Sequence, residues 1–489
     1  MNKFAGRLVC FGLMAVTALT ASSPAMSQEA GSMRTDRIAG LPDFVDGILA
    51  QQLAQEEVVG AVVAVVADGK PLFSRGYGFA DIERGIPVDA NQTLFRVASV
   101  TKLFTFTALM QLVDAGKVDL DAPVDRYLDF PIPATRAHPI LVKHLLDHSA
   151  GFEDNEDIAV DGPSKFQELG TWLRTHLPAR VREPGAEISY SNYGATLAGY
   201  IVQRVCGEAF SSYVDRHVLR PLGMSSSTFS EPVGPNVAVG YKHVDGRLIA
   251  NPYEYYHNVM PAGGLSSTGE DMMRFMVAEL NGGASILPAA VLKEMWETRR
   301  ANAAGLPGLA AGFLVYKSEA PRIVGHGGDI RDFHSIVMLI PEAKFGLFVS
   351  LSTGKVNIDA RTDIQTAIIG RLFPAVASKR LLVSSEKPLL GTYRTNRRNY
   401  SAPPSPKQDL IVEAVDDSTI RTRSSRATII WERIGPDLYE QVSGTRPGGP
   451  YNQLKFHGDA ADPKLSLSQS PHILYRYVAP PATVTSEGN

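Results

Sequence analysis

Strand-forming segments lie at both ends of the first 375 residues of this chain, and the long stretch between them is helical. The apolar runs Val58 to Ala67 and Pro71 to Phe79 flank Asp68-Gly69, a dipeptide typical of a β-hairpin turn. Strands and helices grouped in this way predict an α+β fold. Four more β-type runs follow near residue 310: Gly312 to Tyr316, Arg322 to Gly325, His334 to Ile340 and Phe345 to Ser352.

Helices are expected before the first strands and after the last. Phe44, Ile48, Leu49 and Leu53 recur at helical spacing, and Asp363 to Leu372 has the pattern of a final helix. We therefore predict an antiparallel sheet flanked by helices, with an all-α lobe beside it formed by residues from about 100 to 300. A binding site is expected between the lobe and the sheet.

The composition changes after residue 375. Residues 376–388 have the composition of a linker, and residues 389–480 hold short β-type runs separated by Pro, Gly, Asp and Ser. Strands of this length and spacing predict a small all-β, barrel-like domain. The preceding domain is assigned to residues 41–375, and residues 481–489 are predicted to be a disordered tail. The six runs are Gly391–Arg394, Leu410–Val415, Thr428–Trp431, Leu438–Val442, Gln453–Phe456 and Ile473–Val478.

The N-terminus has the pattern of a secretory signal peptide. Lys3 and Arg7 precede an apolar run from Leu8 to Leu19, and small residues follow at Ala25-Met-Ser27. The run is about a dozen residues long, whereas a membrane span needs about 20, which favours cleavage over a retained anchor. We predict a signal peptide at residues 1–27, a polar leader at 28–40 and a periplasmic or secreted protein without a stable membrane span.

Charge and cysteine content narrow the possible partners. The formal net charge is −3 and the basic residues are scattered, which argues against nucleic acid as a partner. Cys206 is the one cysteine left after signal cleavage, so an internal disulfide is excluded. A small molecule or a short peptide is the expected substrate, and the oligomeric state is left open.

Ser99 and Lys102 begin a strongly apolar helical stretch that ends at Gly116. Apolar side chains cover nearly every side of it, and a helix of that kind is buried. A serine and a lysine three residues apart on a first helical turn project to the same side. Burial and the positive end of the helix dipole disfavour the lysine cation, so the amine is suited to act as a base for the serine. A second Ser-x-x-Lys, at Ser384–Lys387, lies in the predicted linker and is set aside.

Tyr190-Ser191-Asn192 precedes a helical run from Tyr193 to Val205, and two interpretations of it remain open. Ser191 or Asn192 is suited to cap the N-terminus of that helix. If the loop instead faces Ser99, the Tyr190 phenol beside the lysine would be stabilised in its ionised form and would carry protons between the serine and a leaving group.

His326-Gly327-Gly328 lies at the end of a predicted strand. Two glycines let a substrate backbone approach closely and allow backbone N–H groups to point at an oxyanion. An ordinary turn is the alternative interpretation.

His144, Asp147 and His148 raise the alternative of a metal site at helical spacing. The phrase that contains them is better interpreted as a structural helix end, and neither a metal nor an organic cofactor is predicted.

Three sequence motifs, in this order, resemble those of the penicillin-recognising serine hydrolases: Ser99-Val-Thr-Lys102, Tyr190-Ser191-Asn192 and His326-Gly327-Gly328. The branch that they resemble contains class C β-lactamases, D,D-carboxypeptidases, D-aminopeptidases and related esterases. The resemblance covers about residues 41–375. It extends to four further phrases: Phe95-Arg-Val-Ala-Ser99, Leu145-Leu-Asp-His-Ser-Ala-Gly151, Pro221-Leu-Gly-Met224 and Ala262-Gly-Gly-Leu-Ser-Ser-Thr268.

This resemblance implies acyl-enzyme chemistry without a cofactor, and it implies a role for each matching residue. Ser99 would be the nucleophile and Lys102 its base. Tyr190 would be the second acid/base group, and Asn192 would hold the lysine and the substrate amide. His326 stands where β-lactamases have a lysine.

The resemblance also implies an oxyanion hole formed by the N–H groups of Ser99 and Asp329, with Gly327 and Gly328 lining the substrate. Two departures weaken the case for an efficient β-lactamase. His326 is neutral for much of the time at pH 7, whereas a β-lactam carboxylate is usually met by a permanent cation. Asp329 directly follows the glycines and would repel an anionic substrate if its carboxylate turned inward.

The leading hypothesis is an exported serine hydrolase that cleaves an amide or ester bond through an acyl-serine intermediate. Its substrate would be a β-lactam, a peptide containing D-residues or a short acyl ester. A non-catalytic penicillin-binding sensor or scaffold and an acyltransferase are the alternatives.

Overall fold

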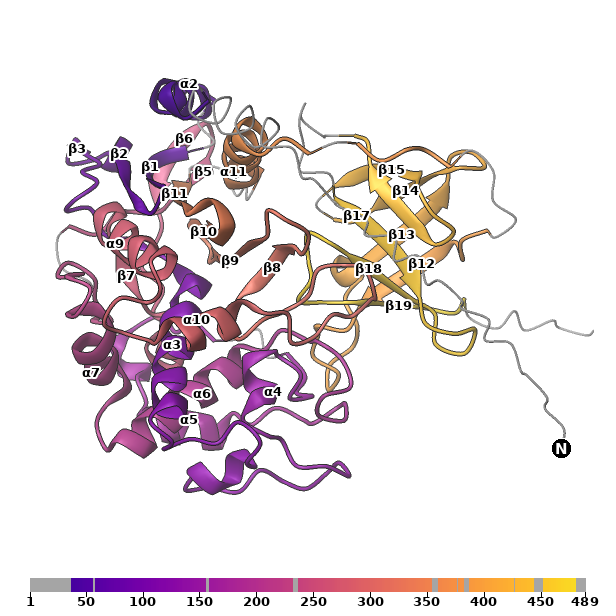
Figure 1. Ribbon diagram of the computed structural model, residues 1–489, viewed down its shortest axis with the longest axis horizontal. Helices are drawn as coiled ribbons and strands as arrows, with labels where there is room; N and C mark the ends of the chain where they lie inside the picture. The colour runs from indigo at the N-terminus through magenta and orange to yellow at the C-terminus, as the bar shows by residue number, and fades with distance from the viewer. Residues whose placement is uncertain are drawn as a thin grey trace, which may run out of the picture.

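The computed structural model describes residues 37–480 apart from 56–57, 155–157, 232–235, 354–358, 376, 382–386, 426 and 444–451. The predicted signal peptide, the leader up to residue 36 and the predicted tail lie outside the described residues. Two parts of the chain lie side by side in Figure 1: a sheet with helices around it, and a yellow and orange barrel formed by the C-terminal residues.

A seven-stranded antiparallel sheet forms the centre of the first part, in the order β3-β2-β1-β11-β10-β9-β8. Strands from the two ends of this part therefore share one sheet, which confirms the predicted α+β fold. The central strands β1 and β11 are buried at every position, because helices cover both of their faces. The strands are β1 (Val58–Ala67), β2 (Lys70–Asp81), β3 (Ile86–Pro87), β8 (Leu314–Lys317), β9 (Ile323–Asp329), β10 (Phe333–Ile340) and β11 (Phe345–Thr353).

The two faces of the sheet are covered by different helices. The terminal helices α2 (Leu41–Ala54) and α11 (Asp359–Leu372) pack against each other and bury one face with their apolar residues. Helix α9 (Gly269–Leu280) packs on the other face, where the sheet and the helical lobe share one continuous core. The lobe and the sheet therefore meet through α9 and the residues around α3.

The regular structure of the lobe between the two groups of strands is mostly helical, as predicted, and long loops join its helices. Two small two-stranded sheets, β4 (Phe95–Arg96) with β7 (Ser266–Ser267) and β5 (Tyr241–Val244) with β6 (Arg247–Ala250), were not predicted because each strand is so short. The remaining helices are α3 (Thr101–Asp114), α4 (Lys143–Leu146), α5 (Leu169–Thr175), α6 (Asn192–Cys206), α7 (Phe210–Val214), α8 (Met260–Gly263) and α10 (Ala289–Trp296).

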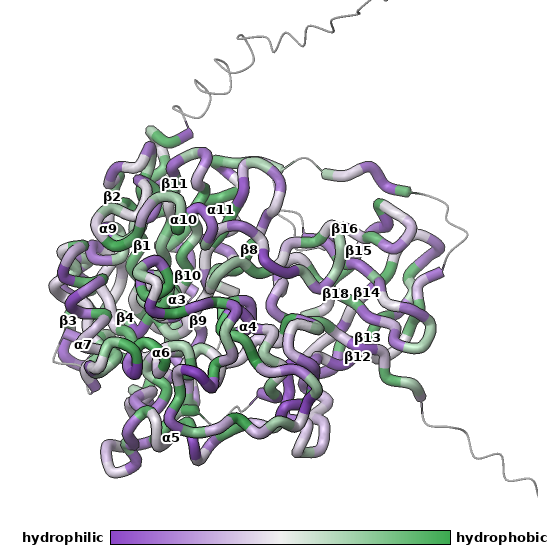
Figure 2. Tube along the Cα trace, turned by 60° about the horizontal axis from the view of Figure 1, so that its bottom comes forward, coloured by the Kyte–Doolittle hydropathy of each residue, from purple (hydrophilic) through white to green (hydrophobic). Residues whose placement is uncertain are grey.

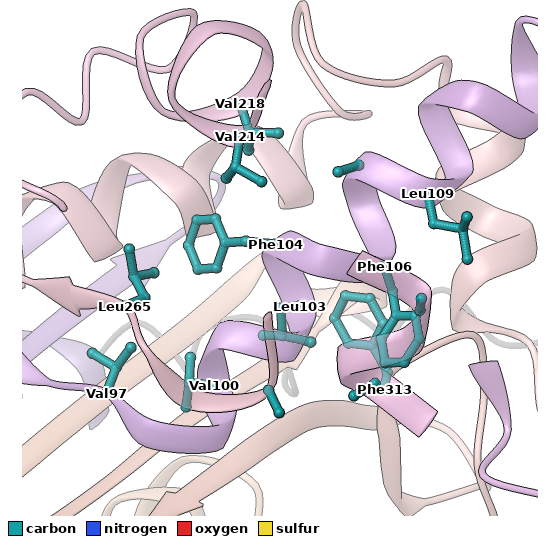
Figure 3. Packing of buried hydrophobic residues seen from close by; sticks show 14 of the residues in the cluster. Val97, Val100, Leu103, Phe104, Phe106, Leu109, Val214, Val218, Leu265 and Phe313 are labelled. Carbon is teal, nitrogen blue, oxygen red and sulfur yellow. The ribbon is translucent and has the colours of Figure 1, made fainter. Parts of the chain in front are cut away.

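Helix α3 lies at the centre of the lobe. Its side chains are buried on almost every side, among residues of α6, α7 and α8, Phe313 and the segment around Leu265 (Figure 3). Gly116, with φ of 67°, follows the end of the helix and adopts the left-handed conformation that glycine reaches at little cost. A helix so enclosed holds the residues of its first turn in a fixed place.

The C-terminal domain is a closed, eight-stranded antiparallel barrel. Figure 2 shows hydrophilic and hydrophobic residues alternating along its strands, as a barrel with one face buried requires. Two of the eight strands, β14 and β18, were not predicted, because their sequences Thr-Ile-Arg-Thr-Arg and Lys-Leu-Ser-Leu hold only one or two apolar residues each. The strands are β12 (Gly391–Thr395), β13 (Asp409–Ala414), β14 (Thr419–Arg423), β15 (Thr428–Arg433), β16 (Leu438–Gln441), β17 (Gln453–His457), β18 (Lys464–Leu467) and β19 (Tyr475–Tyr477).

The described part of the predicted linker runs along the barrel. The Ser378 backbone N–H donates to Glu440 (2.9 Å), and the Leu381 N–H donates to the Arg433 carbonyl (2.7 Å). These bonds anchor residues 377–381 to the barrel wall. Within the part of the chain that the structure describes, no helix combines the length and the apolarity needed to cross a membrane.

Candidate active site

Five sequence-predicted residues from three separate parts of the chain meet at one place. Ser99 lies in the 3-10 turn η1 (Ala98–Val100), and Lys102 lies in the first turn of α3. Tyr190 precedes α6, Asn192 is the first residue of α6, and His326 lies in β9. The rings of Tyr190 and His326 are 5.9 Å apart, and the Lys102 Nζ atom is 4.8 Å from the Tyr190 ring centre.

Lys102 connects the nucleophile candidate to the rest of the site. Its Nζ atom lies 3.0 Å from Ser99 Oγ, 2.8 Å from Asn192 Oδ1 and 2.7 Å from the Ala262 carbonyl oxygen. The side chain is fully buried, and this burial, helped by the charge of Arg397, lowers the pKa of Lys102 well below its usual value of 10.5. A neutral amine fits the three contacts, because its two hydrogens go to the two carbonyl oxygens and its lone pair accepts the Ser99 hydroxyl proton.

The backbone around Ser99 is unusual. Ala98 has φ of 49°, a left-handed conformation that costs energy for a residue with a Cβ atom. The Thr101 hydroxyl donates to the Ala98 carbonyl oxygen at 2.6 Å and accepts from the Leu265 backbone N–H at 3.1 Å. These bonds hold the turn that presents the Ser99 side chain at the start of α3.

Strand β9 passes directly against this turn. A Cβ atom on Gly328 would lie 2.1 Å from the Val97 carbonyl oxygen and 3.0 Å from the Ser99 backbone nitrogen. Only a glycine lets β9 come this close. The approach places Gly328 of β9 directly beside the backbone of Ser99.

The two glycines of this strand differ, which gives a matched test. A Cβ atom on Gly327 would have as its nearest neighbour the end of the Arg361 side chain at 3.4 Å, an ordinary contact. We expect Gly328→Ala to lower the free energy of unfolding by about 1–3 kcal/mol through overpacking, whereas Gly327→Ala leaves it nearly unchanged. Thermal melts of the two variants measure the difference, and equal melting temperatures would contradict the close approach.

Tyr190 is a buried, protonated phenol in this structure. Burial raises the pKa of Tyr190, and the neighbouring Ser99 hydroxyl and the Arg397 charge lower it only in part. The phenol oxygen has no ordinary hydrogen-bond partner among the described residues. The pKa of Tyr190 is raised overall, so the phenol favours its protonated form, contrary to the expectation that Lys102 would stabilise the ionised form. As a protonated group, Tyr190 is an acid facing Ser99.

His326 is a neutral imidazole. Burial is the main cause that lowers the pKa of His326 to about 3. Its Nδ1 atom lies 2.6 Å from the Gly327 carbonyl oxygen, so we assign the proton to Nδ1. The Nε2 atom then carries a lone pair and is buried without a partner among the described residues. His326 thus offers an acceptor rather than the cation found at this position in β-lactamases.

The segment Tyr190-Ser191-Asn192 has both predicted roles, helix capping and a place in the site, and neighbouring residues perform them. Ser191 caps α6, because its Oγ atom accepts from the Gly194 backbone N–H at 3.0 Å. Asn192 instead holds Lys102. Capping and site geometry are therefore both served by one loop.

Asp329 does not present an unpaired carboxylate. Its Oδ1 atom lies 2.7 Å from Arg361 Nη1 and 2.8 Å from His334 Nδ1. Burial raises the pKa of Asp329, but the charges and hydrogen bonds of Arg361 and His334 outweigh it, and the pKa is lowered overall. The repulsion anticipated for an anionic substrate is thus largely compensated by Arg361, which also lies 3.5 Å from the Gly328 carbonyl oxygen.

The segment that contains His144, Asp147 and His148 makes structural contacts next to the candidate site. The His148 ring stacks on Tyr190 with 4.4 Å between the ring centres, and its Nδ1 atom accepts from the Ser191 backbone N–H. Asp147 pairs with Arg300 at 3.2 Å and accepts from the Ser149 hydroxyl. His144 Nδ1 accepts from the Leu141 N–H. No group of metal-ligating residues occurs among the described residues.

The barrel domain contributes residues that the sequence did not reveal. The Tyr190 backbone N–H donates to the His472 carbonyl oxygen at 3.0 Å, and the two rings are 5.4 Å apart. The Arg397 guanidinium lies over the Tyr190 ring, 4.7 Å from its centre, and its Nε atom is 2.9 Å from Asp154 Oδ2. No motif marks these residues, because only the packing of the barrel against the lobe brings them to Ser99.

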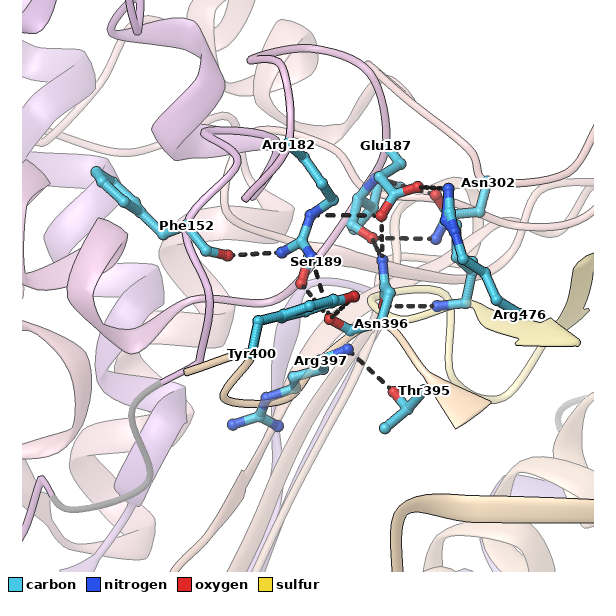
Figure 4. Close-up of polar contacts among 12 residues, drawn as sticks. Phe152, Arg182, Glu187, Ser189, Asn302, Thr395, Asn396, Arg397, Tyr400 and Arg476 are labelled. Carbon is cyan, nitrogen blue, oxygen red and sulfur yellow. Dashed lines mark hydrogen bonds and ion pairs between the residues drawn. The ribbon is translucent and has the colours of Figure 1, made fainter. Parts of the chain in front are cut away.

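A buried polar network fixes this packing (Figure 4). Asn396 lies at its centre: its side chain donates to Glu187 at 3.0 Å and to the Ile188 carbonyl oxygen, and it accepts from the Leu474 backbone N–H. Arg476 of β19 pairs with Glu187 at 2.6 Å. The hydrogen bonds of Asn396 and the ion pair of Arg476 join the two domains, so they hold the barrel in place relative to Tyr190.

Sequence comparisons relate this chain to one known family and to a curated relative. A sequence model of the beta-lactamase family matches residues 45–369. Protein flp of Staphylococcus aureus (strain MW2) is 24% identical over 316 residues, which are 62% of this chain and 62% of flp. The chain therefore spans less than two thirds of the length of this curated relative.

Solved structures are also similar to this one, and two of them illustrate the likeness. The octameric penicillin-binding protein homologue from Pyrococcus abyssi superposes with a TM-score of 0.59 and 22% identity, over 89% of this chain and 99% of that one. The D-amino acid amidase from Ochrobactrum anthropi SV3 superposes with a TM-score of 0.58 and 26% identity, over 68% of this chain and 98% of the amidase.

Proposed function

We propose, because this chain belongs to the beta-lactamase family, that it hydrolyses an amide or ester bond through an acyl intermediate on Ser99. The family and its amidase neighbour support a hydrolase. A single observation carries the finer proposal: the buried Nζ atom of Lys102 has two carbonyl acceptors and the Ser99 hydroxyl around it. This arrangement leaves the lone pair of a neutral amine free to take the serine proton.

Acylation would use the groups in a fixed order. Ser99 Oγ forms a bond to the substrate carbonyl carbon while its proton passes to Lys102. The carbonyl oxygen becomes an oxyanion, which the N–H groups of Ser99 and Asp329 stabilise. The bond to the leaving nitrogen or oxygen then breaks, the leaving group takes a proton from Tyr190, and Tyr190 takes back the proton held by Lys102.

Deacylation would repeat these steps with water. Water attacks the acyl carbon and gives a proton to the Tyr190–Lys102 pair, and the departing Ser99 oxygen regains that proton. The net reaction consumes one water and releases one acid and one amine or alcohol. Asn192 holds Lys102 in place, and His326 offers an acceptor to the bound substrate.

The protein is also proposed to act after export, in the periplasm or outside the cell. The support is the sequence of residues 1–27: two basic residues, a short apolar run and small residues after it. The substrate is proposed to be a short peptide, a β-lactam or an acyl ester that is available there.

Covalent labelling tests the proposed nucleophile. The wild-type protein is incubated with a fluorophosphonate and, separately, with a fluorescent penicillin, digested, and analysed by mass spectrometry. We expect one adduct, on the peptide that contains Ser99. An adduct on another residue, or the absence of any adduct, would falsify the proposal.

Turnover separates a hydrolase from its alternatives. Rates with nitrocefin, p-nitrophenyl butyrate and a D-alanyl p-nitroanilide identify the preferred bond, and release of the free acid identifies hydrolysis. An acyl-enzyme that forms quickly and never breaks down would indicate a penicillin-binding sensor. Products joined to an added amine would indicate an acyltransferase.

A further inference from the structure

The end of β9 that passes Ser99 is held by backbone pairing on one edge alone. Strand β10 pairs with β9 over residues 324–329, but β8 pairs with it only over residues 323–325. Among the strands that the structure describes, β10 is thus the single neighbour of the end of β9, which contains Gly327 and Gly328. Glycine has more backbone freedom than any other residue. A strand end of this kind needs further contacts if it is to keep a fixed position beside Ser99.

Arg361 supplies such contacts. It lies in the first turn of α11, and its Nη1 atom is 2.7 Å from Asp329 Oδ1 and 3.0 Å from the Ser335 carbonyl oxygen. The same atom lies 3.5 Å from the carbonyl oxygen of Gly328. Ser335 is the residue of β10 directly opposite Gly328. One guanidinium nitrogen therefore contacts both residues of this pair and the side chain of the next residue along β9.

The position of Arg361 is fixed from the other face of the sheet. Helix α11 packs with α2 on the face opposite the lobe, and its residues Ala360 and Ile364 are buried in the core there. The Arg361 side chain itself is only 9% exposed. Because packed interiors leave buried side chains little room, the guanidinium is a firm anchor for the end of β9.

A second group holds the same carboxylate. His334 of β10 lies opposite Asp329, and its Nδ1 atom is 2.8 Å from the oxygen that Arg361 binds. Burial raises the pKa of Asp329, but the charge of Arg361 and the hydrogen bond of His334 outweigh it, so the carboxylate is ionised at neutral pH. Hydrogen bonds to an ionised carboxylate are stronger than those between neutral groups. Asp329 is thereby tied to both α11 and β10.

The peptide group between Gly328 and Asp329 is the part of β9 that these contacts control. The Ile330 N–H donates to the Phe333 carbonyl oxygen at 3.1 Å, so the next pair, which contains Asp329, is one without backbone hydrogen bonds between its members. The Asp329 N–H accordingly points away from β10, while the Gly328 carbonyl points toward β10 and Arg361. Because the peptide group is planar, a contact that fixes its carbonyl also fixes the direction of its N–H.

We propose that Arg361 is a positioning residue of the reaction, which aligns the Asp329 backbone N–H with the oxyanion. The inference rests on the proposed function, in which this N–H and that of Ser99 stabilise the oxyanion. Arg361 holds Asp329 at its carboxylate and at the far end of its peptide group, and it acts through these contacts rather than on the substrate. Its loss should therefore weaken stabilisation of the transition state and leave substrate binding nearly unchanged.

Steady-state kinetics of full-length Arg361→Met test this role. The substrate is whichever of nitrocefin, p-nitrophenyl butyrate and the D-alanyl p-nitroanilide the wild type cleaves fastest. Rates are divided by the final extent of fluorophosphonate labelling, which counts intact sites. We expect kcat and kcat/KM per labelled site to fall together by about 10- to 100-fold, with KM changed by less than about 3-fold. A purely structural role would instead lower the melting temperature and the number of labelled sites but keep kcat per site.

A double-mutant cycle tests whether Arg361 acts through Asp329. Asp329→Ala removes the other partner and should lower kcat in the same way. The double variant should be slower than Arg361→Met by no more than about 3-fold, because its second substitution removes a contact that is already lost. It also leaves no unpaired carboxylate, so its kcat decides the question if Arg361→Met does not fold.

Arg371, in the last turn of the same helix, provides the matched control. Its Nε atom donates to the Arg37 carbonyl oxygen and its guanidinium lies over the Phe44 ring, so Arg371→Met also removes an arginine contact of α11 but should keep the wild-type kcat per labelled site.

Four outcomes overturn the inference. They are a kcat within about 3-fold of wild type in both Arg361→Met and the double variant, a loss that lies in KM alone, single losses that add in the double variant, and an equal loss of kcat in Arg371→Met. Absence of turnover together with absence of Ser99 labelling in the wild type would instead overturn the proposed function.

Discussion

Replacing Ser99 by alanine is expected to reduce the turnover of every substrate by about 10⁴-fold or more and to abolish covalent labelling. The hydroxyl is the atom that forms the acyl bond, and removal of a nucleophile costs about this much in serine hydrolases that use a base in the same way. The variant should fold normally, because Ser99 is only partly buried. Steady-state rates, labelling and a thermal melt measure the three quantities.

A matched serine serves as the control. Ser212 lies exposed on α7, so Ser212→Ala should keep wild-type rates, labelling and melting temperature. Retention of more than about one tenth of the rate in Ser99→Ala, with Ser212→Ala unchanged, would remove Ser99 from the mechanism. Retained labelling in the same variant would point to another nucleophile.

Replacing Lys102 by methionine should slow acylation by about 10³-fold, within the range expected for loss of a base and of its proton transfers. Methionine has a similar length and suits a buried position, but it leaves the Asn192 amide and the Ala262 carbonyl oxygen without a donor. Each unsatisfied group costs about 1–3 kcal/mol, so a lower melting temperature is also expected. Lys102→Arg should be equally slow, since a guanidinium stays protonated and cannot accept the serine proton.

The pH dependence of acylation identifies the base. Only the neutral amine accepts a proton, so the rate should rise with pH through the pKa of Lys102 and then level off. Because burial lowers the pKa of Lys102 well below 10.5, the plateau should be reached well below pH 10.5. Lys117→Met, which changes an exposed lysine just after α3, should leave this profile unchanged. A profile that rises only near pH 10.5, or fast acylation by Lys102→Met, would contradict the assignment.

Most of the catalytic fold was predictable from local patterns. Apolar runs around Asp68-Gly69 identify the β1–β2 hairpin, and the four β-type runs after residue 310 identify β8, β9, β10 and β11. The central strands give the strongest signal because they are buried on both faces. The barrel was recognised from strand spacing, although β14 and β18 were missed. Arginines and a lysine on their outer face remove the apolar signal, while the few inward residues suffice in a closed barrel.

The candidate residues were predicted from short sequence motifs, but their protonation states and ion-pair partners were not. The carboxylate of Asp329 was a concern in the sequence, and the structure pairs it with Arg361 from a helix 32 residues further on. Tyr190 was expected to be stabilised in its ionised form, and the structure instead buries it against other rings, which raises its pKa in spite of the nearby Arg397 charge. A pKa depends on everything packed around the group, and no local pattern specifies that surrounding.

The sequence by itself determined what depends on neighbours a few residues apart. Ser99 and Lys102 share one side of a helical turn because of helical periodicity, and α3 is buried because apolar residues cover it. The tertiary structure decided which distant groups meet that pair: Tyr190 and Asn192 from the start of α6, His326 from β9, and Arg397 from a second domain. These contacts depend on how the sheet, the lobe and the barrel pack together. Many sequences with the same short motifs can pack differently.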